Sequence, residues 1–310
     1  MKQYSRIYAA VMDRPWALLP SKLAAIVEVL DLRMAGLELS AEEIQARIGN
    51  PRRPEQSAQG SVAVLPVYGV MSQRMNMLQA TSGGASTEML GRAFSDLVRD
   101  PQIGAIILDI DSPGGDVFGT AELGDIIYDA RGSKPIVAVA NSLAASAAYW
   151  IASQADELVV TPSGQVGSIG VYTAHRDVSA ALEQDGEKVT LISAGKYKVE
   201  GNPYEALSDE ARAAVQDRID TYYGMFTQAV ARGRGVKTDD VRSGFGQGRT
   251  VGAREAVRLG MADRVGTLQQ TIDRFTGSTS APLGARAEAP DPELVSGLDF
   301  RKRRLRMLGR

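Results

Sequence analysis

Short apolar runs typical of strands recur through the middle of the chain. They lie at residues 62–67, 103–110, 135–140, 157–160 and 189–192. Helical patterns lie between them at residues 87–98, 121–130 and 145–152. The run at 103–110 is almost continuously apolar, as expected of a parallel strand buried on both faces. Because strands and helices alternate, the pattern predicts an α/β fold.

Further helices are predicted on both sides of this region. Ser208 opens a long helix with acidic residues in its first turn, where they complement the helix dipole. A last helix over 253–259 stops at Gly260, a normal C-terminal glycine. Near the N-terminus, Ser21 is expected to cap a helix that runs to Arg33, and Ser40 begins a capping box.

Two stretches of linker composition divide the chain. Residues 50–60 are polar and contain prolines, and the chain after Phe275 is rich in Gly, Ser, Thr, Ala and Pro. We therefore expect a helical N-terminal arm and linker over residues 1–57, a main domain over 58–275, and a linker with a basic tail over 276–310. The arm is expected to pack on the main domain or on a neighbouring subunit.

Two residue counts limit the possible chemistry. The chain has no cysteine, which excludes a cysteine nucleophile, a disulfide framework and a thiolate metal site. Its single histidine, His175, excludes the zinc-protease motifs that need two histidines on one helix. A Ser-His-Asp triad is possible only through His175, so other acid–base chemistry must come from lysine, carboxylate or tyrosine. We expect neither a metal nor a cofactor.

Charge and hydropathy bear on location and partners. No window approaches the roughly 20 consecutive apolar residues of a membrane span, and residues 1–16 lack the apolar core of a secretion signal. The net charge of −2 gives no general attraction to nucleic acid or acidic lipid. We expect a cytoplasmic location and no membrane association. The basic run within residues 301–310 is expected to be a solvated tail, with docking on an acidic partner or nucleic acid as the alternative.

The candidate chemistry lies in three turns rich in glycine or alanine, at residues 111–116, 141–150 and 164–171. In the first, Gly114 and Gly115 let the backbone turn sharply and bring N–H groups close to a ligand. In the second, Ser146 stands among small residues at the start of a helix, where its hydroxyl can face a cleft. Ser142 is the competing serine and is more typical of a turn or cap.

An oxyanion hole can be formed from the same turns. The N–H of Ala147 and one from Gly114 or Gly115 are the candidate donors. Donors fixed in place on a developing oxyanion commonly contribute about 3–4 kcal/mol each. The blander interpretation is an alanine-rich helix that packs closely on a sheet.

In this order and spacing, the turns resemble the signal peptide peptidase A family of serine proteases, built on the Clp-protease/crotonase fold of repeated β-β-α units. The resemblance covers residues 60–275. The segments that carry it are 111–115, 144–149, 155–156, 167–171, 193–198, 248–256 and 259–266.

The resemblance implies that Ser146 is the nucleophile and Lys198 the general base. An exposed lysine, with a pKa near ~10.4, is a poor base at neutral pH, but desolvation favours its neutral amine. We therefore predict that Lys198 lies in an apolar, water-poor cleft within hydrogen-bond reach of Ser146. Lys196 is the rival base, because two residues apart in an extended segment point the same way, and only the family pattern favours Lys198. Ser168 is a possible third group that orients the amine.

His175 is the other candidate base, because Clp peptidases use a Ser-His-Asp triad on this fold. When Pro162 is matched to the proline before the Clp histidine, that histidine falls near Ser168 or Ile169. We therefore expect His175 to be a surface or loop residue.

The N-terminal arm, with Pro-Trp-Ala-Leu-Leu-Pro at residues 15–20, resembles the phage and prophage branch of the family. Those relatives are head-maturation proteases that trim scaffold and capsid proteins, and typical cellular members carry a membrane anchor that we do not find here. The resemblance implies a protein or peptide substrate and a homo-oligomeric ring, with active sites at subunit interfaces. It also implies a location in the host cytoplasm or the procapsid.

Three alternatives stay open. The first is a general cytoplasmic peptidase of the same family that degrades peptides. The second, from the crotonase side of the fold, is an acyl-CoA hydratase or isomerase, which would leave Ser146 and Lys198 without a role. The third is a non-catalytic assembly scaffold, against which the presence of both residues argues.

Overall fold

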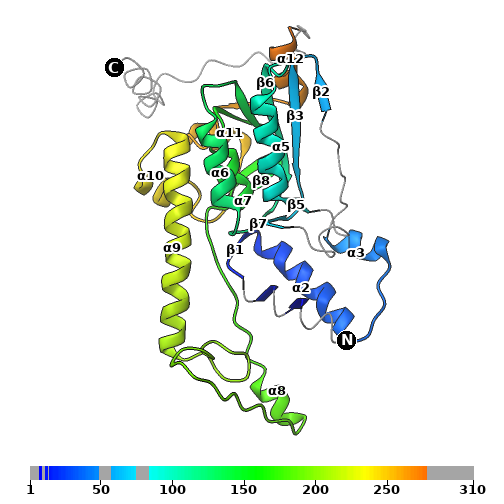
Figure 1. Cartoon of the computed structure of the whole chain (residues 1–310), viewed down its shortest axis with the longest axis vertical. Helices are drawn as coiled ribbons and strands as arrows, with labels where there is room; N and C mark the ends of the chain where they lie inside the picture. Colours follow the sequence, from blue (N-terminus) through cyan, green and yellow to red (C-terminus); the bar gives the residue numbers. More distant parts are fainter. Residues whose placement is uncertain (1–6, 9–10, 13, 49–56, 75–83, 278–310) are drawn as a thin grey trace.

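The computed structural model describes residues 7–8, 11–12, 14–48, 57–74 and 84–277 (Figure 1). The strands are β1 (Trp16–Leu18), β2 (Ser57–Gln59), β3 (Val62–Tyr68), β4 (Met71–Ser72), β5 (Ala85–Ser86), β6 (Ala105–Ser112), β7 (Gly114–Asp116), β8 (Ile136–Ala145), β9 (Glu157–Val160), β10 (Gln165–Gly167), β11 (Thr250–Gly252) and β12 (Arg264–Val265). The helices are α2 (Pro20–Met34), α3 (Ala41–Ile48), α5 (Thr87–Arg99), α6 (Thr120–Asp129), α7 (Ala147–Ala152), α8 (Ser179–Gln184), α9 (Asp209–Arg234), α10 (Thr238–Gly244), α11 (Ala253–Arg258) and α12 (Leu268–Thr276).

The larger of two sheets forms the centre of the molecule. Its strands lie in the order β11-β10-β8-β6-β3-β2, while β9 pairs with β8 and β12 with β9. Strands β3, β6, β8 and β9 run parallel to one another. Helices α5, α6 and α7 pack against one face, and α12 contributes Ile272 and Phe275 to the other. The central strands are buried on both faces, which explains their nearly continuous apolar runs.

The smaller sheet contains short strands in the order β1-β7-β4-β5. Along the chain, β3 is followed by β4, β5 and α5, and β6 is followed by β7 and α6. A long strand of the larger sheet, a short strand of the smaller sheet and a helix therefore recur. The predicted α/β fold of repeated β-β-α units is confirmed.

The N-terminal arm contributes both helix and strand. Strand β1 pairs antiparallel with β7, a contact that the sequence pattern did not predict. Helix α2 begins at Pro20 with Leu19 as its N-cap, so the predicted cap at Ser21 is wrong: proline suits the first helical position, where no N–H partner is needed. The capping box is confirmed, since Ser40 N–H donates to Glu43 Oε2 at 2.7 Å and Glu43 N–H to Ser40 Oγ at 3.1 Å.

Residues 173–207, here called the lysine segment, include α8 and project away from the sheets, as does the first half of α9 (Figure 1). The predicted strand at 189–192 is wrong: these residues are irregular, and Ile192 is 96% exposed. An apolar run forms a strand only where another strand offers its backbone for pairing, and the described residues offer none here. None of the helices in the described ranges is long and apolar enough to cross a membrane.

The predicted division at residues 57 and 275 stays a prediction. Strand β1 shows that part of the arm is integral to the smaller sheet. Helix α12 ends at Thr276, so the basic run within residues 301–310 lies outside the described residues.

Candidate active site

Ser146 lies at the junction between β8 and α7 in a strained backbone conformation. Its φ of 56° and ψ of −120° are rarely adopted by a residue with a Cβ. The conformation is held from both sides, because Ser146 N–H donates to Gly167 O at 2.7 Å and Ser146 O accepts from Trp150 N–H at 2.9 Å. A serine on a strained strand-to-helix turn is the arrangement of a nucleophile elbow, here without the Gly-x-Ser-x-Gly sequence.

The adjacent glycines of the first turn lie against this serine and against β4. A Cβ built on Gly114 would lie 2.9 Å from the Cβ of Ser146, and the φ of Gly114 is 99°. A Cβ on Gly115 would lie 2.0 Å from Met71 O. Both positions therefore require glycine, and the structure brings Gly114 directly beside Ser146 as the motif predicts.

The candidate oxyanion donors differ in their present partners. Ala147 is the first residue of α7, so its N–H has no acceptor within the helix. Gly114 N–H donates to Ser112 Oγ at 3.2 Å and would have to share this bond with an oxyanion. Ala147 is thus the donor most directly placed for a group bound at Ser146.

Helix α7 is buried along its whole length, and Ser146 is its N-cap, so the packing of α7 holds Ser146 in place. Trp150 stacks on Phe226 of α9 with ring centroids 4.7 Å apart. Tyr149 donates from its hydroxyl to Met261 O at 2.9 Å, and burial raises the pKa of this hydroxyl far above its ordinary value, so it stays a neutral donor. Next to this bond, Arg234 forms a bidentate ion pair with Asp263. Its Nη1 donates to Asp263 Oδ2 at 2.8 Å and its Nη2 to Asp263 Oδ1 at 3.0 Å.

The third turn also reaches the nucleophile. Strand β10 pairs with β8 so that Gly167 lies opposite Ala145, which places Ser168 next to Ser146. Ser168 is 6% exposed, has a φ of 53° and donates from its N–H to Arg249 O at 2.8 Å. Ser146 Oγ is 3.5 Å from Gly170 O, a contact at the limit of a hydrogen bond.

The candidate bases lie elsewhere, on the lysine segment. Lys198 is exposed and takes part in no side-chain hydrogen bond or ion pair among the residues described here. The predicted dry cleft shared with Ser146 is therefore not formed within one chain. Lys196 and Lys198 occupy a turn, not the expected extended segment, so their side chains need not point the same way.

Lys196 and His175 both have other partners. Lys196 Nζ contacts Tyr197 OH at 2.7 Å and Glu210 Oε1 at 2.9 Å, and these bonds raise the pKa of Lys196 and keep it charged. His175 is exposed, with Nε2 3.0 Å from Asn202 O, which agrees with the expected surface position. Ser142 is also exposed, but it lies within β8, with a φ of 121°, so the expected turn or cap position is wrong.

Two contributors to the site went unnoticed in the sequence. Strand β1 lies against Gly114, and the Gly170 carbonyl faces the Ser146 hydroxyl. The only sequence signal for β1 is the apolar run Trp-Ala-Leu-Leu between two prolines, which does not reveal a partner strand about a hundred residues further along the chain.

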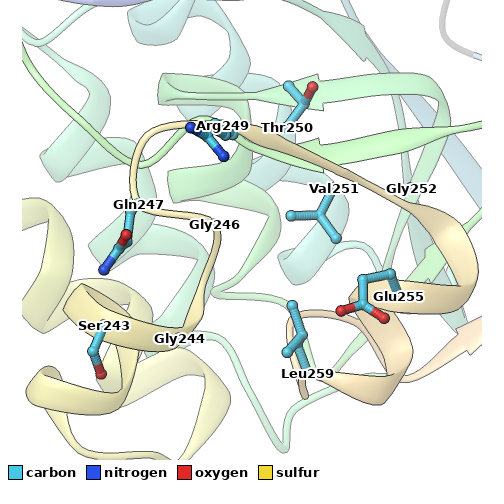
Figure 2. A pocket seen from close by; sticks show the side chains of 10 residues that line it. All are labelled: Ser243, Gly244, Gly246, Gln247, Arg249, Thr250, Val251, Gly252, Glu255 and Leu259. Atoms are coloured by element: carbon cyan, nitrogen blue, oxygen red, sulfur yellow. The ribbon is translucent and has the colours of Figure 1, made fainter.

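A pocket of about 490 Å³ opens near the third turn (Figure 2). It lies between the end of α10, β11 and α11, and its lining includes Gln247, Arg249 and Glu255. None of the predicted catalytic residues lines it. The candidate catalytic residues therefore do not lie in this pocket.

Comparison with known proteins bears on the same residues. The family model described as "Peptidase family S49" matches residues 129–280, a range that contains Ser146, Ser168 and Lys198. The chain is 36% identical to "Capsid assembly protease C" of Escherichia phage lambda over 239 residues, 75% of this chain and 54% of that protein. It is 33% identical to "Head-tail preconnector protein GP5" of Enterobacteria phage P21 over 255 residues, 77% of this chain and 51% of that protein.

The chain thus spans about half the length of these curated relatives. Among solved structures, a ClpP1 mutant from Listeria monocytogenes matches 67% of this chain and 92% of its own. The TM-score is 0.39 and the sequence identity is 14%.

Proposed function

Because the chain contains a peptidase family S49 domain, we propose that it is a serine endopeptidase with Ser146 as nucleophile and Lys198 as general base. The observation that carries the proposal is the strained Ser146, held beside Gly114 at the start of a buried helix. In the proposed reaction, Ser146 Oγ attacks a peptide carbonyl and its proton passes to the Lys198 amine. The oxyanion accepts a hydrogen bond from Ala147 N–H. As the oxyanion collapses, the peptide C–N bond breaks and the Lys198 ammonium gives its proton to the leaving amine. The Lys198 amine then takes a proton from water, which attacks the acyl group and releases it from Ser146 as a carboxylic acid, while the proton returns to Ser146 Oγ.

The base is supplied by a neighbouring copy of the chain. Lys198 is exposed and has no contact with Ser146 in its own chain. The segment that carries it exposes large apolar side chains, among them Leu191, Ile192 and Tyr197. Clustered exposed apolar residues are typical of interaction surfaces, and a neighbouring copy placed there would remove water from Lys198 and favour its neutral amine. This arrangement makes the active site a product of assembly.

Lys196 is the less suitable base. Its bonds to Tyr197 and Glu210 stabilise the charged amine, which has no lone pair to accept a proton. Lys198 has no such competing partner among the described residues.

The proposed substrate is a capsid or scaffold protein that is trimmed during phage head maturation. This proposal rests on the relatives named for capsid assembly and for the head-tail preconnector. A general peptide-degrading role is the alternative within the family. Co-expression with capsid and scaffold proteins distinguishes the two: site-specific trimming supports maturation, while unselective degradation of any unfolded protein supports the alternative.

The test of the chemistry compares two pairs of matched variants on an unfolded protein substrate. Ser146→Ala and Lys198→Ala are expected to lose cleavage, whereas Ser142→Ala and Lys196→Ala are expected to keep it. Lys198→Arg should also be inactive, since arginine is not deprotonated in proteins. Full activity of Lys198→Arg would rule out lysine as the base, and full activity of Ser146→Ala would rule out the nucleophile.

A further inference from the structure

Strand β1 fills the edge of the smaller sheet that lies beside the nucleophile. Trp16, Ala17 and Leu18 pair antiparallel with Asp116, Gly115 and Gly114. The ladder continues beyond the strand, since Leu19 N–H donates to Pro113 O at 3.0 Å. An exposed strand edge is the usual place for an extended peptide to bind through its backbone.

The opposite side of β1 is paired as well. Trp16 N–H donates to Tyr172 O at 2.8 Å, and Tyr172 N–H donates to Trp16 O at 3.0 Å. Tyr172 lies two residues beyond Gly170, whose carbonyl faces the Ser146 hydroxyl. Strand β1 is therefore held between two backbone segments, and each of these leads to the candidate catalytic serine.

The strand also approaches the nucleophile itself. The position of a Cβ on Gly114 would be 2.3 Å from Ala17 O and 2.9 Å from the Cβ of Ser146. Ala17 is 0% exposed, Leu18 is 1% exposed and Ser146 is 1% exposed. A nucleophile has to reach the carbonyl it attacks, so a substrate can reach Ser146 only after something covering it moves.

We propose that β1 is an intramolecular pseudosubstrate, which occupies the peptide-binding edge of β7 and must leave before a substrate strand can pair there. This inference rests on the proposed peptidase function. It also describes the ligand: an extended peptide, antiparallel to β7, with a small residue in the place of Ala17 and large apolar residues on either side.

The contacts of β1 determine how much free energy its detachment from β7 requires. Trp16 and Leu18 form a small apolar cluster with Leu23, apart from the main core. Arg14, just before the strand, pairs with the buried carboxylate of Asp116. Of the three residues of β1, only the small Ala17 belongs to the main core. Detachment of β1 would therefore remove one small side chain from that core, together with the Arg14–Asp116 pair.

A reversible covalent lock tests the inference in the full chain. The chain has no cysteine, so Trp16→Cys with Tyr172→Cys would introduce one thiol pair. Residues that exchange both hydrogen bonds across antiparallel strands lie about 5.5 Å apart at their Cα atoms, within the range of a disulfide. Cleavage of an unfolded protein is measured with the same preparation oxidised and then reduced.

We expect the oxidised double variant to be the least active, the wild-type protein to be intermediate and the reduced double variant to be the most active. The oxidised form should lose nearly all cleavage, and reduction should restore it, because the thiol form lacks both the lock and the Trp16 side chain. A thiol titration confirms that the bond has formed. Equal activity of oxidised and reduced forms would overturn the pseudosubstrate role while leaving the peptidase proposal intact.

A second variant controls for the case in which the disulfide lowers activity by distorting the fold. Leu18→Ala removes apolar contact from β1 alone and is expected to raise kcat/KM about tenfold by favouring the detached state. Unchanged or lower activity in folded Leu18→Ala would contradict the inference. If wild type, reduced double variant and Leu18→Ala all fail to cleave, the peptidase proposal falls and this inference falls with it.

Discussion

The two halves of the proposed catalytic pair are held in opposite ways. Ser146 sits in a platform formed by the three turns and α7, where most residues are buried and the backbone of Ser146 is held by hydrogen bonds to Gly167 and Trp150. Lys198 sits on the lysine segment, which is irregular and exposed along most of its length. The proposed nucleophile is thus positioned by the packing of one chain, whereas the side chain of Lys198 has no hydrogen bond or ion pair to any residue that the structure describes.

This difference implies that one part of the proposed active site forms when the chain folds and the other part forms when copies of the chain assemble. Folding of one chain is sufficient to strain Ser146 and to place Gly114 and Ala147 around it. In the proposed mechanism, assembly is what brings the Lys198 amine to Ser146 and removes water from it. A monomer would then hold a prepared but inactive serine, which limits cleavage to the assembled state.

The largest expected effect comes from disturbing the platform with a single methyl group. Gly114→Ala would place a Cβ 2.9 Å from that of Ser146 and force alanine into a φ of 99°. We expect cleavage to fall by about 100-fold or more, the effect of losing an oxyanion donor, as measured by initial rates. The control is Gly132→Ala, which has a φ of 80° but open space around it. If both variants keep wild-type activity, the platform does not depend on this contact.

The next effect contrasts an ion pair of the platform with one of the lysine segment. Arg234→Ala leaves Asp263 without its buried partner below α7 and should lower the free energy of unfolding by about 3–5 kcal/mol. Lys196→Ala removes an exposed pair with Glu210 and should leave denaturant unfolding unchanged. Equal losses in the two variants would contradict the contrast between a packed and an unpacked region.

The smallest expected effect tests whether the lysine segment meets a neighbour. Ile192→Ser should leave the unfolding of the isolated chain unchanged, because this side chain is 96% exposed. It should weaken assembly by about tenfold, the consequence of losing one buried apolar side chain, as measured by sedimentation over a range of concentrations. Met89→Ser, at a residue 65% exposed on α5, is the control. Unaltered assembly in Ile192→Ser would place the subunit contact elsewhere.

How much could be predicted from the sequence follows the same division. The strand at 157–160 was predicted with its observed bounds, because its apolar run reflects burial within the chain. Ser208 is the N-cap of α9 as predicted, because a cap and the acidic residues after it are a local signal. Gly114 and Ser146 could be placed together, since parallel strands bring the turns at their carboxyl ends to one edge of the sheet.

The failures arise where a segment depends on distant or separate partners. The run at 189–192 is apolar, but no strand in the part of the chain that the structure describes pairs with it, so its pattern was misinterpreted. Strand β1 was not predicted, because a short apolar run between two prolines becomes a strand only through contact with β7. The position of Lys198 relative to Ser146 could not be predicted, because no local pattern specifies which copy of the chain contains its partner.

The central claim is that Ser146 and Lys198 of one active site come from different copies. Its most direct test mixes Ser146→Ala with Lys198→Ala, two variants that are inactive alone, and measures cleavage after the subunits have exchanged. Shared sites should restore about a quarter of wild-type activity at equal amounts in a head-to-tail ring, because half of the serines and half of the neighbouring lysines are intact. A mixture that stays inactive although mixed assemblies form would show that both residues act within one chain and would contradict this account.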